Sequence, residues 1–340
     1  MNPFELTRAL VDIESTTGHE KNVGDYLFAH LAPLATRHDG RLERMPVEPN
    51  RDNIFAFWGE PTVTLSTHMD TVPPFFASGE DDKFIFGRGA CDAKGIIAAM
   101  IAAAEKLLVA GTRNFGLLFV VGEERNSAGA KAAAKTPRGS RFLINGEPTE
   151  NHLAIGSKGA LRYEIAAEGK LAHSAYPELG YSAIHTLLDV LQDIRQIPLP
   201  EDALLGRSTL NIGTIGGGRA PNVVADHAEA EIMFRTVDDP SAIRRAVASA
   251  VAGRAEACEI LHTPAIRLNK LGGLPTTVVA FTTDLPTFNG AWGEPFLIGP
   301  GSIHVAHTGE ERIAKKELME AVEIYAHITT QLLTARRASA

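Results

Sequence analysis

The chain has 340 residues, which at about 150 residues per domain indicates roughly two domains and ample length to bury a core. Hydrophobic residues make up 44% of the chain and charged residues 22%, an ordinary globular composition without a collagen-like or disordered bias. The formal net charge of −8 and the pI of about 5.9 argue against a nucleic-acid partner, because domains that bind nucleic acid usually carry a basic stripe.

Cysteine content and apolar runs point to a compartment. The two cysteines, Cys91 and Cys258, provide no disulfide framework, so a reducing compartment is expected. The N-terminal MNPFELTRALVDIES lacks the basic start and apolar core of a signal peptide. The longest apolar run, Gly95–Ala104, is shorter than the roughly 20 residues that a membrane span needs. We therefore expect a cytoplasmic protein without a membrane partner.

The first third of the chain alternates helical and strand patterns. Apolar residues at three- and four-residue spacing predict helices over 4–13 and 23–31. Short apolar runs predict buried strands at 62–66, 117–121 and 141–145. A strongly apolar helix is predicted over 93–110, with Asp92 as its N-cap and Gly111 at its end. Buried strands that alternate with helices indicate an α/β fold with a mostly parallel sheet flanked by helices.

The pattern changes from about Gly159. Alternating apolar and charged residues predict a strand with one solvated face near 161–167, and the following elements are expected in β-α-β-β-α-β order. These are a helix at 182–197, strands at 209–214 and 228–234, a helix at 242–257 and a strand at 266–271. A buried strand at 295–298 and a helix at 317–332 close the chain. We predict a discontinuous α/β domain, residues 1–157 and 269–340, that is interrupted by an α+β ferredoxin-like domain, residues 158–268.

Residues able to bind a metal follow four of the predicted buried strands. The carboxyl ends of parallel strands share one edge of a sheet, so these side chains should converge there. Asp92 is expected to join them from the glycine-rich loop GRGACDAKG. Each residue alone could be ordinary surface charge, a helix cap or a hydrogen-bonded bystander, but together they predict a metal site. The residues that follow the four strands are His68 and Asp70, Glu123 and Glu124, Glu147, and His304 and His307.

Five motifs occur in order along the chain: STHMDTVPP, GRGACDAKG, VVGEER, NGEPT and GPGSIHVAHT. The set resembles the zinc metallopeptidase and deacylase family of acetylornithine deacetylase, succinyl-diaminopimelate desuccinylase, aminoacylase and glutamate carboxypeptidase (metallopeptidase family twenty). The resemblance covers essentially the whole chain, including the inserted domain.

The resemblance implies a set of metal ligands and a mechanism. His68 and Glu147 would bind one Zn²⁺, Glu124 and His307 the other, and Asp92 would bridge both. His307 suits the family pattern better than His304, because it precedes Thr-Gly-Glu310. Asp70 would orient His68, and Glu123 would be the general base for a hydroxide bridging the ions.

Zinc chemistry agrees with this assignment. Zn²⁺ prefers imidazole and carboxylate ligands, and a carboxylate bonded to a ligating histidine fixes its tautomer. Two zinc ions about 3.5–4 Å apart need a bridge. Glu123 and Glu124 are adjacent, so they cannot both point the same way on an extended backbone, and one can ligate while the other acts as base. Co²⁺ or Mn²⁺ would tolerate the same ligands.

The inserted domain contributes further candidates by resemblance. His173 in GKLAHSAYPELG would stabilise the developing oxyanion, commonly in the partner subunit's site, unless it is a loop histidine packed against Tyr176. Asn222 and Arg235 resemble a substrate-binding pair, and the fork of an arginine suits a carboxylate, although a strand-end arginine is often only solvated. Gly301 and Ser302 could offer N–H groups to that carboxylate. Cys91 is rejected as a nucleophile, because no histidine is visibly paired with it.

The predicted function is that of a di-zinc amidohydrolase that cleaves the amide of an N-acyl amino acid, similar to acetylornithine deacetylase or a lysine-biosynthesis relative. The alternatives are a dipeptidase or carboxypeptidase of the same family, and a metal-binding relative that has lost catalysis. Charged residues without any metal would be a third possibility. A homodimer is expected, with the inserted domain as its lid and dimerisation domain.

Overall fold

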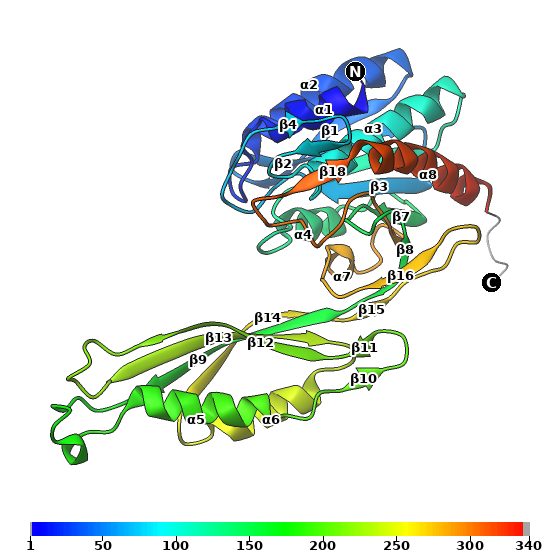
Figure 1. The fold of residues 1–340 in the computed structure, drawn as a ribbon. Helices are drawn as coiled ribbons and strands as arrows, with labels where there is room; N and C mark the ends of the chain where they lie inside the picture. Colours follow the sequence, from blue (N-terminus) through cyan, green and yellow to red (C-terminus); the bar gives the residue numbers. More distant parts are fainter. Residues whose placement is uncertain (1, 336–340) are drawn as a thin grey trace. The chain divides into compact units, whose positions relative to one another are not determined.

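The computed structural model describes residues 2–335, which form two compact units (Figure 1). Unit 1 contains residues 2–155, 268–277 and 283–335, and unit 2 contains residues 156–267 and 278–282. The sequence boundaries placed the insert at 158–268 and did not anticipate that the short segment 278–282 also belongs with it. The main chain therefore passes between the units four times, at 155/156, 267/268, 277/278 and 282/283.

A mixed sheet forms the centre of unit 1, with strands in the order β1-β2-β6-β3-β7-β17-β8. The four middle strands β6, β3, β7 and β17 are parallel, as predicted, and the outer strands pair antiparallel. The strands are β1 (Arg41–Glu48), β2 (Arg51–Trp58), β6 (Phe115–Val120), β3 (Val63–His68), β7 (Phe142–Asn145), β17 (Glu294–Leu297) and β8 (Leu153–Ser157). The β1–β2 hairpin was not predicted, because the mostly polar β1 carries a weak strand signal.

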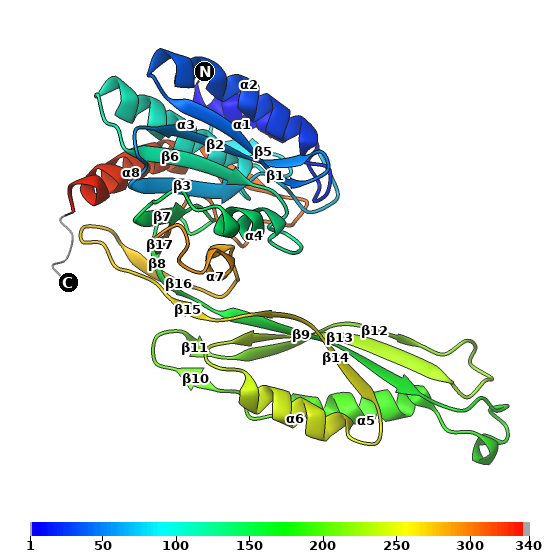
Figure 2. The ribbon, with the colours of Figure 1, turned by 180° about the vertical axis from the view of Figure 1, so that it is seen from behind.

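Helices cover both faces of this sheet (Figures 1 and 2). Alternate residues of β2 face opposite sides: Ile54 and Trp58 join the large core, and Phe55 packs edge-on against Trp292 on the other side. The large core lies under α1 (Pro3–Val11), α2 (Lys21–Arg37), α3 (Lys94–Val109) and α8 (Lys315–Thr334). The opposite face carries α4 (Ala128–Lys135) and α7 (Leu285–Phe288). This two-sided burial explains the near-continuous apolar character of the central strands.

Short strands complete unit 1 and its chain crossings. β4 (Gly79–Glu80), β5 (Phe84–Phe86) and β18 (Arg312–Ala314) form a small sheet in the order β18-β5-β4. β15 (Ile266–Arg267) and β16 (Thr276–Val279) both pair with β8.

The start of α3 differs from the prediction. The helix begins at Lys94 after Ala93, and no side chain caps it. Asp92 was predicted as the N-cap, but its carboxylate is hydrogen bonded to a histidine instead. This contact takes the carboxylate away from the helix amides.

Unit 2 has the predicted ferredoxin-like arrangement. Its antiparallel sheet has the order β12-β13-β9-β14, and α5 and α6 enclose a separate core with it (Figure 2). The elements are β9 (Gly159–Glu168), α5 (Ala183–Arg195), β12 (Thr209–Gly217), β13 (His227–Thr236), α6 (Ser241–Val251) and β14 (Glu256–Thr263). A 3-10 turn at Pro177–Leu179 and the hairpin of β10 (Glu201–Asp202) and β11 (Gly206–Arg207) lie in its loops.

Two predicted elements of unit 2 were wrong. The helix predicted over 242–257 ends at Val251, and the chain turns at Gly253, whose φ is +72°. The fourth strand of the sheet is β14 rather than 266–271. β14 is a largely exposed edge strand, so its residues lack the clear apolar alternation that identifies a half-buried strand.

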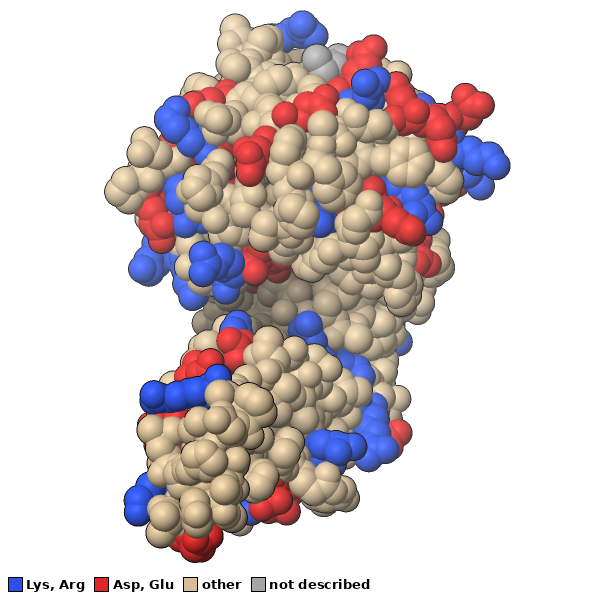
Figure 3. Space-filling model, turned by 60° about the vertical axis from the view of Figure 1, so that its left-hand side comes forward, with Lys and Arg blue, Asp and Glu red and all other residues tan. Residues whose placement is uncertain are grey.

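Two further features concern the hydropathy of the helices and the charge of the surface. No helix within residues 2–335 is both long and apolar enough to cross a membrane. Basic and acidic side chains are interspersed on the face shown in Figure 3.

Candidate metal centre

The parallel strands of unit 1 bring the predicted metal ligands to one sheet edge. His68 is the last residue of β3 and pairs in register with Val120, the last residue of β6. On the other side of β3, Ser66 pairs with Asn145, the last residue of β7. The loops that carry the Glu123–Glu124 pair and Glu147 therefore start beside His68.

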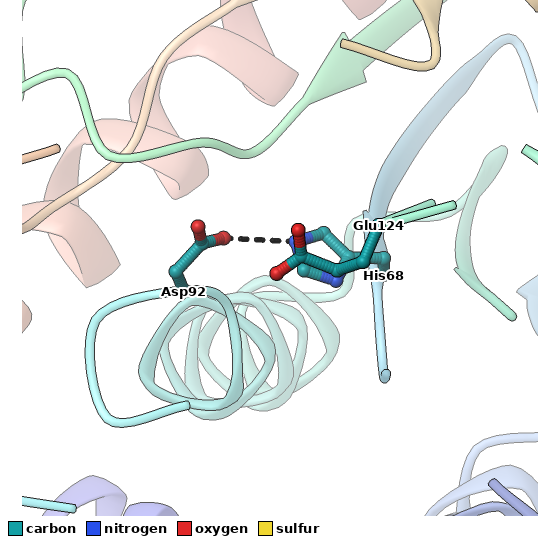
Figure 4. Close-up of side chains that lie close together, drawn as sticks. All are labelled: His68, Asp92 and Glu124. Carbon is teal, nitrogen blue, oxygen red and sulfur yellow. Dashed lines mark hydrogen bonds and ion pairs between the residues drawn. The ribbon is translucent and has the colours of Figure 1, made fainter. Parts of the chain in front are cut away.

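Three side chains lie around the Asp92 carboxylate. Asp92 Oδ1 lies 2.9 Å from His68 Nε2 (Figure 4). Asp92 Oδ2 lies 3.2 Å from His307 Nε2. His307 Nε2 also lies 3.0 Å from Glu124 Oε1. One ligand atom each from His68, Asp92 and Glu124 lie within 4.8 Å of one another. Asp92 thus presents one oxygen to each of two histidines, which is the arrangement that a bridging carboxylate requires.

Asp70 contacts both His68 and the glutamate pair. His68 Nδ1 lies 3.0 Å from the Asp70 main-chain carbonyl oxygen, but 3.6 Å from the nearest carboxylate oxygen. Asp70 therefore contacts the imidazole through its carbonyl and lies within ion-pair distance through its carboxylate, as its predicted orienting role requires. The Asp70 carboxylate accepts hydrogen bonds from the main-chain N–H groups of Glu123, at 3.1 Å, and Glu124, at 3.2 Å, and from the Thr17 hydroxyl at 2.7 Å. Asp70 therefore holds the backbone of the glutamate pair.

The centre carries more negative than positive groups. Burial, with nearby carboxylates, raises the pKa of Glu123 and of Glu147 well above the usual value, and burial also raises the pKa of Glu124. Hydrogen bonds to Asp92 and Glu124 raise the pKa of His307 to about 10. Although burial opposes ionisation of Asp92, its two histidine partners lower its pKa. A buried cluster with an excess of carboxylates stabilises an added positive charge.

This chemistry fits a bound dication. Imidazole nitrogens and carboxylate oxygens are the donors that Zn²⁺ prefers in protein sites. A divalent cation would also offset the repulsion between carboxylates that raises their pKa values. The donor set of the centre therefore meets both requirements of a metal site.

Glu147 and His304 lie outside the group of side chains that contact one another around Asp92. Glu147 is buried, and its carboxylate accepts a hydrogen bond from the Asn145 side-chain amide at 3.3 Å. No polar contact joins Glu147 to a histidine within residues 2–335. His304 is exposed and lies outside the group, so His307 is the histidine that the structure places against Asp92 and Glu124.

The turn at Gly301 and Ser302 already has internal partners. The Gly301 N–H donates to Glu317 Oε2 at 3.0 Å, and the Ser302 hydroxyl donates to Glu150 Oε1 at 2.6 Å. A role of either group toward a substrate carboxylate would require these bonds to be replaced. Cys91 is buried beside this turn, and burial raises the pKa of its thiol, which disfavours a nucleophilic role.

Unit 2 places two of its candidates side by side. The Ser174 N–H donates to the Asn222 carbonyl oxygen, which brings His173 and Asn222 together on exposed loops. His173 Nδ1 accepts the Ala175 N–H at 3.1 Å, so Nε2 is the ring nitrogen that can donate a hydrogen bond.

Arg235, the third candidate in unit 2, is part-buried near the end of β13. Burial lowers the pKa of its guanidinium, and no carboxylate within the described chain pairs with it. An unpaired, part-buried guanidinium is suited to bind an anion.

Sequence reasoning missed one buried acid. Asp284, just before α7, is 1% exposed, and Ser127 is the side chain that interacts with its carboxylate, without a well-formed hydrogen bond to either oxygen. It lies close enough to the centre to raise the pKa of both Glu123 and Glu147. Burial raises its own pKa to about 6. No motif marks it, and an acid before a four-residue helix reads as an ordinary loop residue.

Comparison with known proteins identifies relatives over nearly the whole chain. A protein described as Peptidase M20 domain-containing protein from Schizosaccharomyces pombe is 39% identical over 334 residues, covering 95% of this chain and 83% of the relative. A protein named Probable carboxypeptidase from Aspergillus terreus is 36% identical and covers 95% of this chain and 85% of the relative.

Solved structures with lower identity share the fold. An M20 family metallo-carboxypeptidase from Sulfolobus solfataricus matches with a TM-score of 0.79 at 16% identity, over 98% of this chain and 99% of the other. An aminopeptidase PepT from Bacillus cereus matches with a TM-score of 0.78 at 20% identity, over 98% of both chains.

The sequence profile of the family described as Peptidase family M20/M25/M40 matches residues 64–331, which include every residue of the candidate metal centre. The chain therefore belongs to peptidase family M20/M25/M40 and is a hydrolase of carbon–nitrogen bonds in peptides or amides.

Proposed function

We propose that the protein is a metal-dependent carboxypeptidase or dipeptidase, which cleaves an amide bond next to a free carboxylate. The observation that carries this proposal is the meeting of His68, Asp92, Glu124 and His307 at one sheet edge beside two more buried glutamates. The names of the curated relatives support a carboxypeptidase. An N-acyl amino acid, the substrate class that the sequence motifs favoured, remains the second candidate, because it presents the same carboxylate beside its amide.

The proposed ligand set would hold two metal ions. His68 and Glu147 would hold one, Glu124 and His307 the other, and Asp92 both, because its two oxygens face different histidines. When bound, zinc would polarise the scissile carbonyl and make water a stronger acid. Co²⁺ or Mn²⁺ would suit the same donors.

Glu123 is the proposed proton carrier. Its side chain makes no hydrogen bond with either histidine of the centre, unlike that of its neighbour Glu124. Burial and the nearby Glu147 raise its pKa, which brings the carboxylate closer to the range where it can both accept and donate a proton. It would take a proton from the attacking water and deliver it to the leaving nitrogen.

Unit 2 would recognise the substrate. The unpaired Arg235 guanidinium would bind the free carboxylate, and Asn222 would hydrogen bond beside it. His173 would donate from Nε2 to the oxyanion, a use that its Nδ1 contact leaves open. With these assignments unit 2 would serve as the predicted lid domain.

A panel of substrates tests the proposal. Zinc-loaded protein would be assayed against dipeptides, longer peptides and N-acetyl or N-succinyl amino acids, each paired with its C-terminal amide. Loss of the carboxylate should lower kcat/KM by about 10- to 100-fold, the value of a hydrogen bond to a charged group. Equal rates on both members of each pair would overturn the requirement for a carboxylate. Bound metal without hydrolysis of any substrate would instead indicate a metal-binding relative without catalysis.

The same pairs test Arg235. Arg235→Ala should raise KM for substrates with a free carboxylate and leave the C-terminal amides unchanged, so that the two losses are not additive. Arg245→Ala, which removes an arginine of α6 in the same unit, is the matched control. An equal effect of Arg235→Ala on both members of each pair would remove Arg235 from carboxylate recognition.

We further propose a homodimer assembled through unit 2. The edge strand β12 is mostly exposed, and unpaired strand edges readily pair with another chain. Large apolar side chains are exposed in the same unit, including Tyr176, Leu179, Tyr181 and Ile215. Sedimentation equilibrium measures the assembly state directly, and a monomer at assay concentrations would overturn the proposal.

Mixed variants show whether His173 acts across the dimer. Glu123→Ala and His173→Ala proteins, each inactive alone, would be mixed and allowed to exchange subunits. If His173 serves its partner's site, random mixing should restore about a quarter of wild-type activity. No recovery in demonstrated heterodimers would place His173 in its own subunit's site or in a structural role.

A further inference from the structure

Glu311 lies in a polar cradle formed by the loop that carries Asp92. It is 1% exposed and follows His307 by four residues, directly before β18. Its Oε1 accepts main-chain N–H groups from Gly89 at 2.9 Å, Asp92 at 3.1 Å and Cys91 at 3.3 Å. One carboxylate oxygen thus collects three donors from a four-residue segment that ends at a proposed metal ligand.

The second carboxylate oxygen fastens the same loop from its other end. Glu311 Oε2 accepts a hydrogen bond from Arg88 Nη1 at 2.5 Å, and Arg88 is 2% exposed. The Arg88 guanidinium also lies over the Phe76 ring and donates to the Pro74 carbonyl oxygen. The Gly87 N–H donates to the Glu311 carbonyl oxygen. Side chain and main chain of Glu311 therefore both hold residues 87–92.

These contacts connect two distant segments of the proposed centre. Asp92 and His307 are far apart in sequence, and Glu311 binds the backbone of the first while lying four residues from the second. β18, which follows Glu311, pairs with β5, which precedes the loop, so the backbone restrains both segments together. Because Glu311 holds the loop amides, it also holds the backbone position from which the Asp92 side chain extends.

We propose that Glu311 is a positioning residue that sets the Asp92 carboxylate against His307, before any metal binds, through its bonds to the loop amides. The inference rests on the proposed role of Asp92 as a metal ligand. It assigns no direct contact between Glu311 and metal or substrate. Partners that orient metal ligands typically contribute 10- to 100-fold to metal affinity.

Two substitutions distinguish the effect of the hydrogen bonds to the loop amides from the effect of burying a charge. Glu311→Leu removes all acceptors, whereas Glu311→Gln keeps one oxygen for the three amides and loses the charge that pairs with Arg88. Glu20→Gln is the matched control, because Glu20 is 1% exposed and pairs through both oxygens with Arg51, in the same unit but without bonds to residues 87–92.

Metal affinity measured by chelator competition, with thermal unfolding alongside, is the readout. Glu311→Leu should bind zinc or Co²⁺ about 10- to 100-fold more weakly than Glu20→Gln, and Glu311→Gln should recover part of that loss. The Co²⁺ absorption bands of Glu311→Leu should also differ from those of the wild type. Wild-type affinity and bands in the Glu311 variants, or a loss matched by Glu20→Gln at equal thermal stability, would overturn the inference.

Hydrogen exchange in the unsubstituted protein provides a measurement that does not depend on the variants folding. The amides of Gly89, Cys91 and Asp92 should be protected in metal-free protein as well as in metal-loaded protein. Protection only after metal addition would show that metal, not Glu311, orders the loop, and would overturn the inference.

The premise is tested separately. Asp92→Asn should weaken metal binding in the wild-type background. If it does not, the proposed ligand set fails. If it does while the Glu311 variants bind normally, only the positioning role of Glu311 fails.

Discussion

Glu123 and Glu124 are neighbours in the chain, yet the fold gives them different surroundings. Their main-chain N–H groups both donate to the Asp70 carboxylate, while their side chains have different contacts. Glu124 reaches His307, and Glu123 has no such contact. The two residues lie in a turn and not on the extended backbone that was expected, and their side chains have different partners, as the proposed separation of ligand and base requires.

Glu123→Gln tests that division. The amide keeps the size of the side chain but cannot carry the proton, so kcat should fall by about 10²- to 10⁴-fold. Metal content, measured by atomic emission, should remain that of the wild type. Glu124→Gln is the contrasting variant and should lose metal as well as activity. Loss of metal from Glu123→Gln would reassign Glu123 as a ligand.

Asp284 is expected to make stability depend on pH. Its folded-state pKa of about 6 lies above the unfolded value of about 3.9, so the folded protein binds the proton more tightly. The free energy of unfolding therefore falls as pH rises between about 4 and about 6, and the penalty is complete above that range.

Asp284→Asn removes the buried charge. In metal-free protein it should raise the free energy of unfolding by roughly 3 kcal/mol at pH 8 and by about half as much at pH 5. Urea unfolding at both pH values measures the difference, and Asp82→Asn, an exposed acid in the same unit, is the control. The same change at both pH values would show that Asp284 does not titrate in this range.

At the scale of elements, the site depends on close approach between the end of β6 and the start of α4. Gly129 lies in the first turn of α4, where its N–H donates to the Val121 carbonyl oxygen and its carbonyl accepts from the Asn53 side chain. A Cβ atom at Gly129 would lie 2.5 Å from Asn53 Oδ1 and 2.6 Å from Val121 main-chain atoms. This contact sets where the loop with Glu123 and Glu124 begins and ends.

Gly129→Ala should therefore destabilise unit 1, although alanine favours helices. Because backbone must move to admit the methyl group, we expect a loss of about 1–3 kcal/mol, together with weaker metal binding. Gly272→Ala is the control, since nothing lies within 4 Å of a Cβ there. Urea unfolding followed by tryptophan fluorescence checks the loss, and wild-type stability of Gly129→Ala would contradict the close packing.

Periodic elements were predictable and contact-dependent ones were not. α3 and the central parallel strands carry long or continuous apolar runs, and these were found within a few residues of their positions. The helix predicted over 242–257 extended too far, into the first residues of β14, because the end of α6 and the edge strand have a similar mixture of polar and apolar residues. Short elements such as α7 and β18 depend on packing partners distant in sequence and leave little local signal.

At the scale of the whole molecule, two separate cores predict two unfolding transitions. The proposed ligands all lie in unit 1, and the core of unit 2 contains none of them. With the proposed ligand set, zinc would bind only the folded form of unit 1 and should stabilise that unit by about 2.7 kcal/mol at 100 times Kd, while unit 2 is unaffected.

The sequence supplies reporters for both units. The two tryptophans, Trp58 and Trp292, are in unit 1, and a dye on the exposed Cys258 would report unit 2, because Cys91 is buried. Thermal scans with and without zinc should shift the tryptophan transition and leave the dye transition in place. A single transition that zinc shifts in both signals would show that the units unfold as one.

The sequence by itself determined the fold class, the family and the residues that follow the buried strands. These are properties of local periodicity and of ordered motifs, and parallel strands convert them into a shared edge. The tertiary structure alone decided how the side chains are used. It directed the Asp92 carboxylate to two histidines and not to the helix amides, and it gave the Asp70 carboxylate hydrogen bonds from the glutamate amides. It also buried Asp284 near the centre and Glu311 against the loop that carries Asp92. Hydrogen bonds and packing between segments far apart in the chain make these choices, and no local pattern records them.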